Sequence, residues 1–262
     1  MTIRVGVFGA CGRMGSTVCQ AVLDDPELDL VAAVDPFHAG IDLRQAIGAD
    51  VSIEVMPDAD VLARERADVA VDFTEIDAAR ANTRWCAEHG VHAVVGTTGF
   101  TQADYDDLRS VFTQSNCLIA PNFAIGAVLM MRMAEMAAPY FDTAEIIELH
   151  HDQKTDAPSG TAMLTAARMA AASDQWGRDP TRTEIVPGAR GVEAAPGIRV
   201  HSVRQRGLVA HHEVLLGTTG QGLTIRHDSY DRTSFMPGVL LAVKGIAACP
   251  GLTVGLDSLL GL

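Results

Sequence analysis

Lysine is scarce in this sequence, because 18 of its 20 basic residues are arginine and only Lys154 and Lys244 are lysine. Lysine can release a proton at an accessible pH and arginine cannot, so both positions are candidates for a chemical role. Positive charge as a whole is also in deficit, because 33 acidic residues give a formal net charge of −13. A chain this acidic has no overall field to attract phosphate backbones or anionic lipids, so we expect neither nucleic acid nor a membrane as a partner.

Segments that would signal other classes of protein are missing. No apolar run reaches the roughly 18 to 20 residues of a membrane-spanning helix, and the N-terminus lacks the regions of a secretory signal. The cysteines are odd in number and scattered, without a CxxC pair: Cys11, Cys19, Cys86, Cys117 and Cys249. Zinc-finger, HExxH and HxH spacings are absent as well, so the sequence predicts reduced thiols in a cytoplasmic protein and no metal site.

The first half of the chain alternates short apolar runs with helical segments. Apolar residues make up 48% of the 262 residues and charged residues 20%, so we expect a folded core of one or two domains. Strands that are apolar throughout and separated by helices are typical of a parallel sheet covered on both faces. The predicted strands are residues 3–8, 28–34, 69–73, 91–95 and 118–119, and the predicted helices are residues 14–24, 76–88, 102–112 and 124–138.

The pattern changes near Pro121 and Asn122, where an α+β region begins. Much of this region is rich in glycine and β-branched residues, which predicts a meander whose sheet faces solvent or another subunit. A final apolar helix ends before Pro250 and Gly251, as a helix stop should. The predicted elements are strands at residues 144–150, 198–203, 212–216 and 223–227 and helices at residues 159–172 and 235–248.

A glycine-rich turn follows the first predicted strand. Gly9, Gly12 and Gly15 form a GxxGxxG spacing between that strand and the next helix. Such a turn lets the backbone approach a pyrophosphate, and the helix start offers free N–H groups and a positive dipole end. Asp35 ends the second strand, 20 residues after Gly15, where an acidic group accepts hydrogen bonds from the ribose of a dinucleotide. The alternative is an ordinary tight turn with an acidic residue nearby by chance.

The residues after Asp35 bear on the choice between NADH and NADPH. They are Pro36, Phe37 and His38, so a 2′-phosphate would meet a carboxylate without a nearby arginine. NADH is therefore favoured, although Arg13 in the glycine turn could partly compensate. The GxxxxGK[ST] pattern of a P-loop is absent, which argues against a nucleotide hydrolase of that class.

Two imidazoles and one of the two lysines gather at the end of the strand at residues 144–150. The segment contains His150, His151 and Lys154, followed by a helix start at Ser159, Gly160 and Thr161. Ser159 is a plausible N-cap, and the free N–H groups of the first turn together with Lys154 favour an anion, above all a carboxylate. His150 or Lys154 could also donate a proton to a reacting centre. The alternative is that the histidines are simply solvated.

Other basic side chains lie in the glycine-rich part of the second half. We expect His211 and His212 to be solvated. The arginines there are expected to be surface charge on strands, although some could face a substrate: Arg199, Arg204, Arg206, Arg226 and Arg232.

The segment at residues 148–162 has the pattern E-x-HHxxKxDAPSGT. It resembles the signature of the 4-hydroxy-tetrahydrodipicolinate reductase family, also called dihydrodipicolinate reductase. The resemblance extends over nearly the whole chain, since residues 9–15 are similar to the cofactor loop of that family and residues 71–74, 96–99 and 120–123 to its strand-end loops. The long string is specific, and the other motifs support it.

This resemblance implies the reduction of the dicarboxylate 4-hydroxy-tetrahydrodipicolinate by NADH or NADPH, with loss of water, in diaminopimelate and lysine synthesis. His150 and Lys154 would be the proton donor or acceptor and its partner, and His151, with the helix start at Ser159, Gly160 and Thr161, would hold a carboxylate. The dinucleotide would be bound by Gly9, Ala10, Cys11, Gly12, Arg13, Met14 and Asp35, with Gly96, Thr97, Thr98, Ala120, Pro121, Asn122 and Phe123 along the nicotinamide side.

The family fold implies an α/β protein with two domains. A Rossmann-like, parallel-sheet dinucleotide-binding domain would comprise residues 1–122 with 231–262, and an α+β domain with a mixed sheet would comprise residues 123–230. The second domain would bind the substrate and form a homotetramer. Two other functions stay open at this point: a related two-domain dehydrogenase with a different substrate, and a non-catalytic NAD(H)-binding redox sensor.

Overall fold

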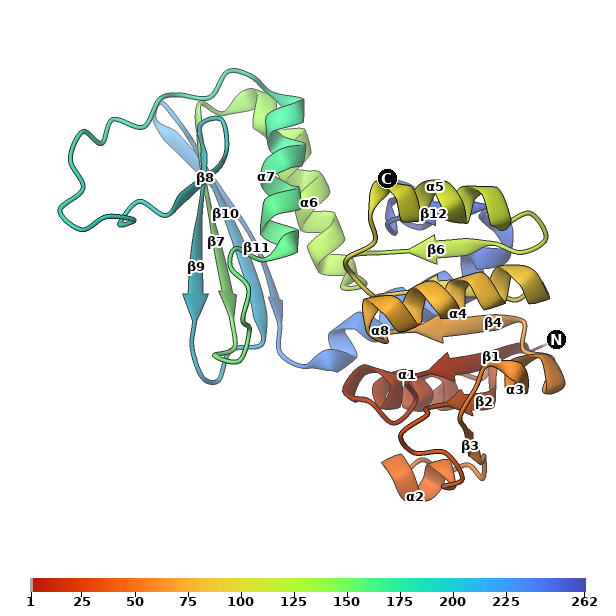
Figure 1. Ribbon diagram of the computed structural model, residues 1–262. Coiled ribbons are helices and arrows are strands. Elements are labelled where there is room, and N and C mark those ends of the chain that lie inside the picture. Colours follow the sequence, from red (N-terminus) through yellow and green to blue (C-terminus); the bar gives the residue numbers. More distant parts are fainter. Residues whose placement is uncertain (1) are drawn as a thin grey trace. The chain divides into compact units, whose positions relative to one another are not determined.

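The computed structural model describes residues 2–262 and divides the chain into two compact units (Figure 1). The first unit comprises the chain up to Phe123 together with Phe235–Leu262, and the second unit is Ala124–Ser234. Within the described residues, no helix combines the length and the apolar character needed to span a bilayer.

The first unit is built on a seven-stranded sheet in which every strand pair is parallel, as the apolar runs predicted. The order β12-β6-β5-β4-β1-β2-β3 reverses direction at β1, which is the switch point of a doubly wound sheet. The strands are β1 (Ile3–Phe8), β2 (Leu28–Val34), β3 (Val55–Met56), β4 (Val69–Asp72), β5 (His92–Val95), β6 (Cys117–Ile119) and β12 (Leu252–Val254).

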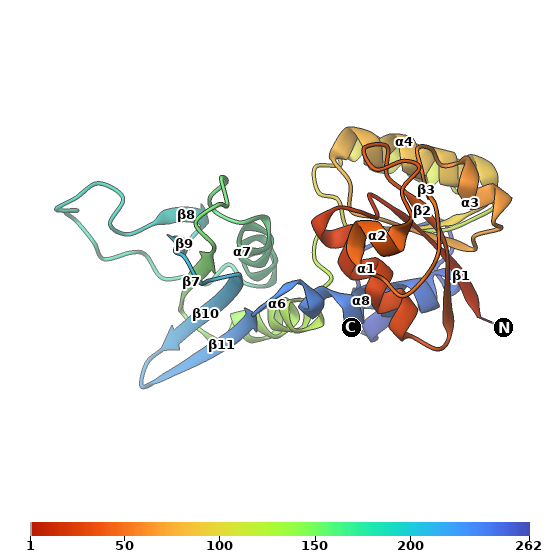
Figure 2. The same ribbon diagram turned by 90° about the horizontal axis from the view of Figure 1, so that it is seen from below.

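Helices cover both faces of this sheet (Figure 2). On one face α1 (Arg13–Asp24) packs against α8 (Met236–Gly245), and on the other α4 (Ile76–His89) packs against α5 (Gln102–Val111). The short helices α2 (Leu43–Ile47) and α3 (Asp60–Arg64) flank β3 in the sequence. Lys244 in α8 forms ion pairs with Asp25, at 2.8 Å, and Glu27. One of the two lysines therefore joins two elements of the first unit.

The glycine turn after β1 is a close approach of backbone to backbone. Gly9 has φ of +63°, in the left-handed region that favours glycine. A Cβ atom on Gly15 would lie 2.0 Å from the carbonyl oxygen of Gly9, so α1 can start this close to the turn only with glycine there. The three glycines thus bring the start of α1 to the carboxyl end of β1.

The second unit holds a mixed five-stranded sheet in the order β11-β10-β7-β9-β8, with α6 (Ile125–Ala137) and α7 (Gly160–Ala172) packed against it and against each other (Figure 1). The mixed sheet and the Rossmann-like first unit confirm the predicted fold class. The strands are β7 (Thr143–His150), β8 (Val192–Ala195), β9 (Ile198–Arg204), β10 (Ala210–Thr218) and β11 (Gln221–Ser229).

The prediction of a meander is wrong for this sheet. The pairs β8–β9 and β10–β11 are antiparallel hairpins, whereas β7 lies between β9 and β10 and runs parallel to β9. The physical reason is the inward row of β7, in which Ala144, Ile146 and Glu148 are all buried and which therefore occupies the centre of the sheet. The spacing of the later strands indicated the strands and the pairing of β10 with β11, but not the partners of β9.

We predict that Gly15→Ala destabilises the first unit although alanine is the better helix former. The added Cβ would overlap the Gly9 carbonyl at 2.0 Å, and overpacking of this kind costs about 1–3 kcal/mol, more than the roughly 0.5–1 kcal/mol that alanine contributes inside a helix. Urea unfolding and an NADH titration measure the two expected losses, in stability and in cofactor affinity.

The matched control is Gln20→Ala in the same helix, where the side chain is exposed and bonds only Asp24, at 2.9 Å. We expect its free energy of unfolding to stay within about 0.5 kcal/mol of the starting protein. A Gly15→Ala protein that is equally stable and binds NADH equally well would contradict the close-approach argument.

Candidate functional site

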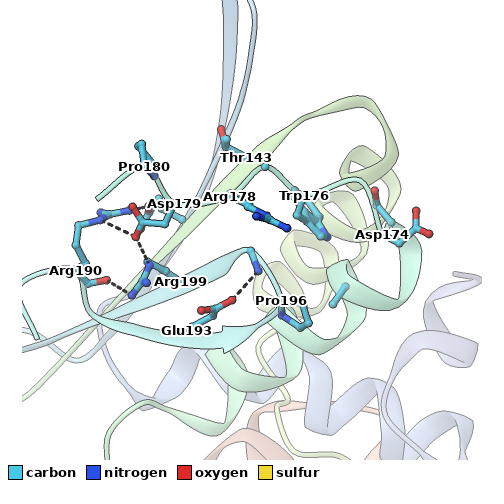
Figure 3. A pocket seen from close by; sticks show the side chains of 16 residues that line it. Thr143, Asp174, Trp176, Arg178, Asp179, Pro180, Arg190, Glu193, Pro196 and Arg199 are labelled. Carbon is cyan, nitrogen blue, oxygen red and sulfur yellow. Dashed lines mark hydrogen bonds and ion pairs between the residues drawn. The ribbon is translucent and has the colours of Figure 1, made fainter. Parts of the chain in front are cut away.

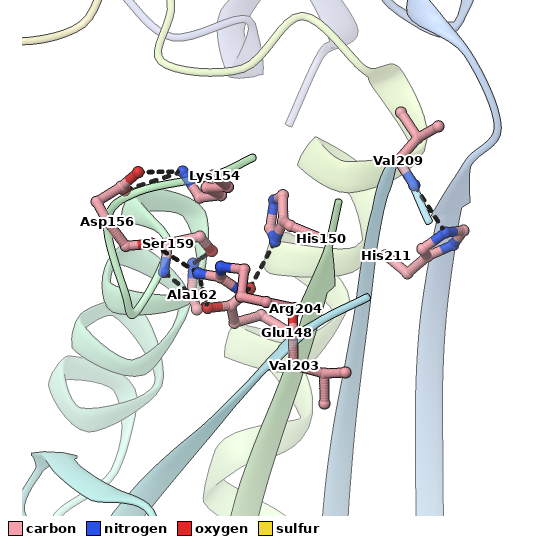
Figure 4. Close-up of polar contacts among 10 residues, drawn as sticks. All are labelled: Glu148, His150, Lys154, Asp156, Ser159, Ala162, Val203, Arg204, Val209 and His211. Carbon is pink, nitrogen blue, oxygen red and sulfur yellow. Dashed lines mark hydrogen bonds and ion pairs between the residues drawn. The ribbon is translucent and has the colours of Figure 1, made fainter. Parts of the chain in front are cut away.

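The predicted His-Lys cluster lies where β7 ends in the second unit (Figure 4). Successive residues of a strand point to opposite faces, so Glu148 and His150 share the inward face with Ile146. Glu148 is 0% exposed, and an acidic side chain is almost never that deeply buried unless it is paired. The inward face of β7 is therefore apolar at Ala144 and Ile146 and carries an ion pair at Glu148 and His150.

Donors from four residues meet the Glu148 carboxylate: His150, Ser159, Ser202 and Arg204. His150 Nδ1 lies 2.5 Å from one oxygen, the two terminal nitrogens of Arg204 lie 2.9 Å from one oxygen each, and the Ser159 N–H donates at 3.2 Å. Burial by itself would raise the pKa of Glu148, but hydrogen bonds from His150, Arg204 and Ser202 lower it to about 2. The carboxylate is thus charged at neutral pH and compensated by a bidentate guanidinium.

Lys154 is held by its own loop. Its Nζ donates to both oxygens of Asp156, at 2.8 and 2.9 Å, and this hydrogen bond holds the pKa of the Asp156 carboxyl below its usual range. Arg204 donates to the carbonyl oxygen of Asp156 at 2.7 Å as well as to Glu148. Arg204 therefore connects the buried carboxylate to the loop that presents Lys154.

The start of α7 is capped as the sequence predicted. Ser159 Oγ accepts a hydrogen bond from the Ala162 N–H at 3.2 Å, and the helix begins at Gly160. A Cβ atom built on Gly160 would meet nothing within 4 Å, so there is open space beside the first turn. His151 is exposed, with its Nδ1 accepting from the Gln153 N–H at 3.2 Å. The arrangement offers an anion a helix start, an amine and an imidazole from one short segment.

The expectation that His211 and His212 are solvated is wrong, because the row that contains Glu148 continues across the sheet. Strand register pairs His212 with Glu148 on one side and with His227 on the other, and His212 is only 5% exposed. Burial lowers the pKa of His212 to about 4, so this imidazole is neutral at pH 7. His211 is also buried and pairs with Asp228 at 2.7 Å.

Arg204 was likewise expected at the surface, and its ion pair with Glu148 corrects that expectation. Arg206, 93% exposed at its side chain, is a surface charge as expected. Sequence reasoning missed Glu148, Arg204 and His212 as members of the site. The available signal was the period of two along residues 144–150, which places an acid in line with Ala144 and Ile146.

The predicted cofactor residues of the first unit follow the carboxyl ends of its strands. Gly9 follows β1, Asp35 follows β2, Gly96 follows β5 and Ala120 follows β6. Dinucleotides bind at this edge of a doubly wound sheet. Gly12 is the N-cap of α1 and provides no side-chain cap, which leaves the first N–H groups of that helix to a ligand.

Asp35 is tied to the glycine turn. Its carboxylate accepts from the Cys11 N–H at 3.2 Å and the Phe37 N–H at 3.1 Å, and it contacts His38 Nδ1 at 3.1 Å. These contacts fix the acid beside the turn. Burial, and then the charge of Asp35, raise the pKa of the Cys11 thiol to about 11, so the thiol stays protonated at neutral pH.

Cys11, Asp35 and His38 are also the one group of three potential metal ligands within residues 2–262, with donor atoms within 4.8 Å of one another. The protonated thiol and the existing hydrogen bonds to Asp35 oppose a cation there. The geometry therefore fits a turn braced by an acid better than a metal centre.

The other strand-end loops pack closely on one another. A Cβ atom on Gly96 would lie 2.0 Å from the ring of Phe73, and that ring lies 5.6 Å from the ring of Phe123. Thr97 Oγ1 donates to the Thr74 carbonyl oxygen at 2.7 Å. The side chains of Ala10, Ala120 and Phe123 are buried, so these positions would meet a ligand through their backbone.

A large pocket of about 590 Å³ lies elsewhere in the second unit, beside Glu145 and Trp176 (Figure 3). Four of its charged side chains are paired: Arg199 Nε lies 2.6 Å from Asp179, and Glu145 accepts from Arg190. His201 Nε2 also contacts Glu145, at 2.5 Å. The pocket contains none of the predicted catalytic, substrate-binding or cofactor-binding residues.

A parallel sheet with a glycine turn, and a separate sheet that presents His150 and Lys154, define a two-unit oxidoreductase of the dinucleotide-binding class. Comparison with known proteins narrows this class. The profile for the N-terminus of dihydrodipicolinate reductase matches residues 3–123, and the profile for its C-terminus matches residues 126–260. The chain belongs to the dihydrodipicolinate reductase family.

Individual relatives agree with this assignment. The chain is 51% identical over 267 residues to a 4-hydroxy-tetrahydrodipicolinate reductase of Cutibacterium acnes, with 99% of both chains covered. It is 51% identical over 269 residues to the reductase of the same name from Nocardia farcinica, with 100% of both covered. A solved dihydrodipicolinate reductase from Paenisporosarcina sp. TG-14, bound to dipicolinate, has 40% identity and a TM-score of 0.85, with 98% of this chain and 99% of that chain covered.

We predict that His212 makes the protein less stable in mild acid. The pKa of His212 is about 4 in the folded state, against 6.5 for an ordinary histidine. As the pH falls below 6.5, the unfolded chain takes up a proton that the folded chain does not, so the free energy of unfolding falls by up to about 1.4 kcal/mol per pH unit. His212→Gln removes this contribution.

Urea unfolding at pH 7.5 and 5.5 tests the sign. The drop in stability between the two conditions is expected to be about 1.4 kcal/mol smaller in His212→Gln than in the starting protein. His151→Gln, which replaces an exposed imidazole, serves as the control and should keep the original drop. An identical drop in all three proteins would mean that His212 takes up its proton equally in both states.

Proposed function

We propose that this chain reduces 4-hydroxy-tetrahydrodipicolinate to tetrahydrodipicolinate with NADH or NADPH and loss of water, a step of diaminopimelate and lysine synthesis. The observation that carries the proposal is the cluster at the end of β7, where His150, Lys154 and the open first turn of α7 come from one short segment. This cluster supports proton transfer beside a carboxylate site. The bound dipicolinate of the Paenisporosarcina enzyme supports a cyclic dicarboxylate as the ligand.

The residues of the first unit fit a dinucleotide. In the cradle formed by Gly9, Gly12 and Gly15, a Cβ atom on Gly15 would lie 2.0 Å from the Gly9 carbonyl oxygen, and α1 starts without a side-chain cap. A pyrophosphate at this turn would accept hydrogen bonds from N–H groups and lie at the positive end of the helix dipole. When bound, the nicotinamide supplies the hydride.

The residues of the second unit would supply the proton and hold the substrate. Because the charged Glu148 can only accept, His150 donates through Nδ1, and Nε2 is the nitrogen left to exchange a proton with a ligand. A ring that receives a hydride becomes electron-rich and needs a nearby acid. Lys154, His151 and the N–H groups at Gly160 and Thr161 would bind the carboxylates, since they supply local positive charge and donors in an acidic protein.

Two other functions explain the site less well. A redox sensor that binds NAD(H) has no use for a proton donor beside an anion site. A related dehydrogenase with another substrate would need the same fold, but identity of 51% over essentially the whole chain to proteins named 4-hydroxy-tetrahydrodipicolinate reductase favours their reaction.

The five cysteines are all unpaired, which supports our proposal of a cytoplasmic location. We also propose a homotetramer formed through the second unit. The sheet face opposite Glu148 presents half-buried apolar side chains, among them Ile147, Leu149 and Leu215, which a second copy could cover.

Oxidation of NADH or NADPH tests the reaction directly. A synthase generates 4-hydroxy-tetrahydrodipicolinate from pyruvate and aspartate semialdehyde in the same cuvette, and absorbance at the reduced-nicotinamide band follows turnover. We expect rapid oxidation by the protein, and a loss of about 10² or more in Lys154→Ala with NADH affinity retained. The matched control is Arg206→Ala, which removes an exposed cation from the same unit and should turn over normally.

Each outcome separates the alternatives. NADH binding without oxidation would favour the sensor, and oxidation of an alcohol by NAD⁺ without activity on the dicarboxylate would favour another dehydrogenase. Unchanged turnover in Lys154→Ala would remove Lys154 from the chemistry.

We further propose that Asp35 favours NADH over NADPH. Its carboxylate lies at the end of β2 beside the glycine turn, where a 2′-phosphate would be repelled. Asp35→Asn keeps an oxygen for the Cys11 N–H and removes the charge. Unit charges about 4 Å apart near a surface interact by roughly 1–4 kcal/mol, so the ratio of kcat/KM for NADH to that for NADPH should fall about tenfold or more.

Asp29→Asn is the control, because it removes a carboxylate from the same strand that pairs only with Arg4, at 3.2 Å. We expect its cofactor ratio to equal that of the starting protein. An unchanged ratio in Asp35→Asn would show that another residue selects the cofactor.

A further inference from the structure

Glu148 stands out among the acidic residues of the second unit. It is 0% exposed, and its two oxygens receive His150 Nδ1, both terminal nitrogens of Arg204 and the Ser159 N–H. These donors come from β7, from β9 and from the start of α7. A buried carboxylate loses the solvation of water, so such a site persists only where the surrounding groups replace it.

We propose that Glu148 is a positioning residue for the reaction, which sets the tautomer and the direction of the His150 imidazole and, through Arg204, anchors the loop that presents Lys154. The proposal rests on the proposed function, because it assigns Glu148 an effect on catalysis through His150. Glu148 itself would touch neither substrate nor cofactor.

The charge on Glu148 selects one tautomer of His150. A charged carboxylate has no proton to give, so the contact of 2.5 Å requires the hydrogen on His150 Nδ1. The opposite nitrogen, Nε2, is then fixed as the group that exchanges a proton with a ligand. A second partner such as a carboxylate is how many sites hold an imidazole in one orientation.

Glu148 is also connected to Lys154, through Arg204 and Asp156. The Arg204 guanidinium donates hydrogen bonds to the Glu148 carboxylate, at 2.9 Å, and to the carbonyl oxygen of Asp156, at 2.7 Å. Asp156 in turn holds Lys154 Nζ at 2.8 Å. The buried carboxylate of Glu148 thus contacts His150 directly and is connected to Lys154 through Arg204 and Asp156.

On the β10 side, Glu148 is next to two histidines that carry no charge near pH 7. His212 faces it from β10, and His227 lies one strand further on β11. Burial lowers the pKa of both imidazoles, so neither adds a charge near pH 7. The compensation of the Glu148 charge near pH 7 is therefore left to Arg204.

The same strand provides a matched comparison. Glu145, on the opposite face of β7, also contacts an arginine and a histidine, Arg190 and His201, but it is partly exposed and far along the strand from His150. If Glu148 only stabilised the fold by an ion pair, the loss of either carboxylate would have the same kind of effect. If Glu148 acts through His150, only its loss changes catalysis.

A double-mutant cycle on the full-length protein separates these cases. Glu148→Gln should lower kcat about 10²-fold with KM for NADH unchanged, since the orientation of a general acid contributes within the roughly 10²–10⁴-fold of the acid itself. His150→Asn should lower kcat at least as much. The protein with both changes should lose clearly less than the product of the two single losses, because residues that act as a unit are not additive. Glu145→Gln, the control, should keep kcat.

The histidine tautomer gives a readout besides activity. In protein labelled with ¹⁵N-histidine, the spectrum of the starting protein at pH 8 should show His150 protonated at Nδ1, assigned by its loss in His150→Asn. This measurement needs no folded Glu148→Gln protein. A His150 protonated at Nε2 would overturn the proposal.

The remaining outcomes also decide it. Losses that multiply in the double variant, or a Glu148→Gln protein whose lost activity equals its unfolded fraction in urea titration, would overturn it in favour of a structural ion pair. Full activity in His150→Asn would overturn it together with the catalytic role of His150, while Lys154→Ala would still report on the proposed function. A starting protein without turnover on the dicarboxylate would instead show that the proposed function fails.

Discussion

The burial of one charge governs the second unit. A carboxylate that is 0% exposed must be met by donors from the protein itself, and Glu148 receives them from Arg204, His150 and Ser159. Arg204 can reach it only because β9 lies beside β7, in the register that pairs Arg204 with His150. The buried ion pair therefore depends on β7 and β9 being neighbours in the sheet.

The first unit depends on a different constraint, which is the approach of backbone to backbone at the glycine turn. A Cβ atom on Gly15 would lie 2.0 Å from the Gly9 carbonyl oxygen, so only glycine fits at this position. This contact determines how closely α1 approaches the carboxyl end of β1. Asp35 then braces the turn through the Cys11 N–H. The same residues that leave room for a phosphate also fix the shape of the space, so cofactor binding and local stability cannot be separated by substitution at Gly15.

The sequence predicted what is local and missed what is long-range. Apolar runs located β1, β2 and β4, and the N-cap at Ser159 was recognisable from its residue type. The strands β3 and β12 have two and three residues, too few for a period to appear. Strand order depends on pairing between distant segments, and for that reason charged residues such as Arg204 were assigned to the surface. A charge on a strand can be placed only once its neighbours are known.

The pairing of Lys154 with Asp156 affects which carboxylate ligands can gain affinity from the lysine. Lys154 is already paired with Asp156, so a carboxylate ligand that takes the amine only exchanges one carboxylate for another and gains little. A second carboxylate changes the balance, because the first turn at Gly160 has open space beside it and lies at the positive end of the helix dipole. On this argument, a monocarboxylate of the same shape binds weakly, and it is the second carboxylate of a dicarboxylate that provides net affinity.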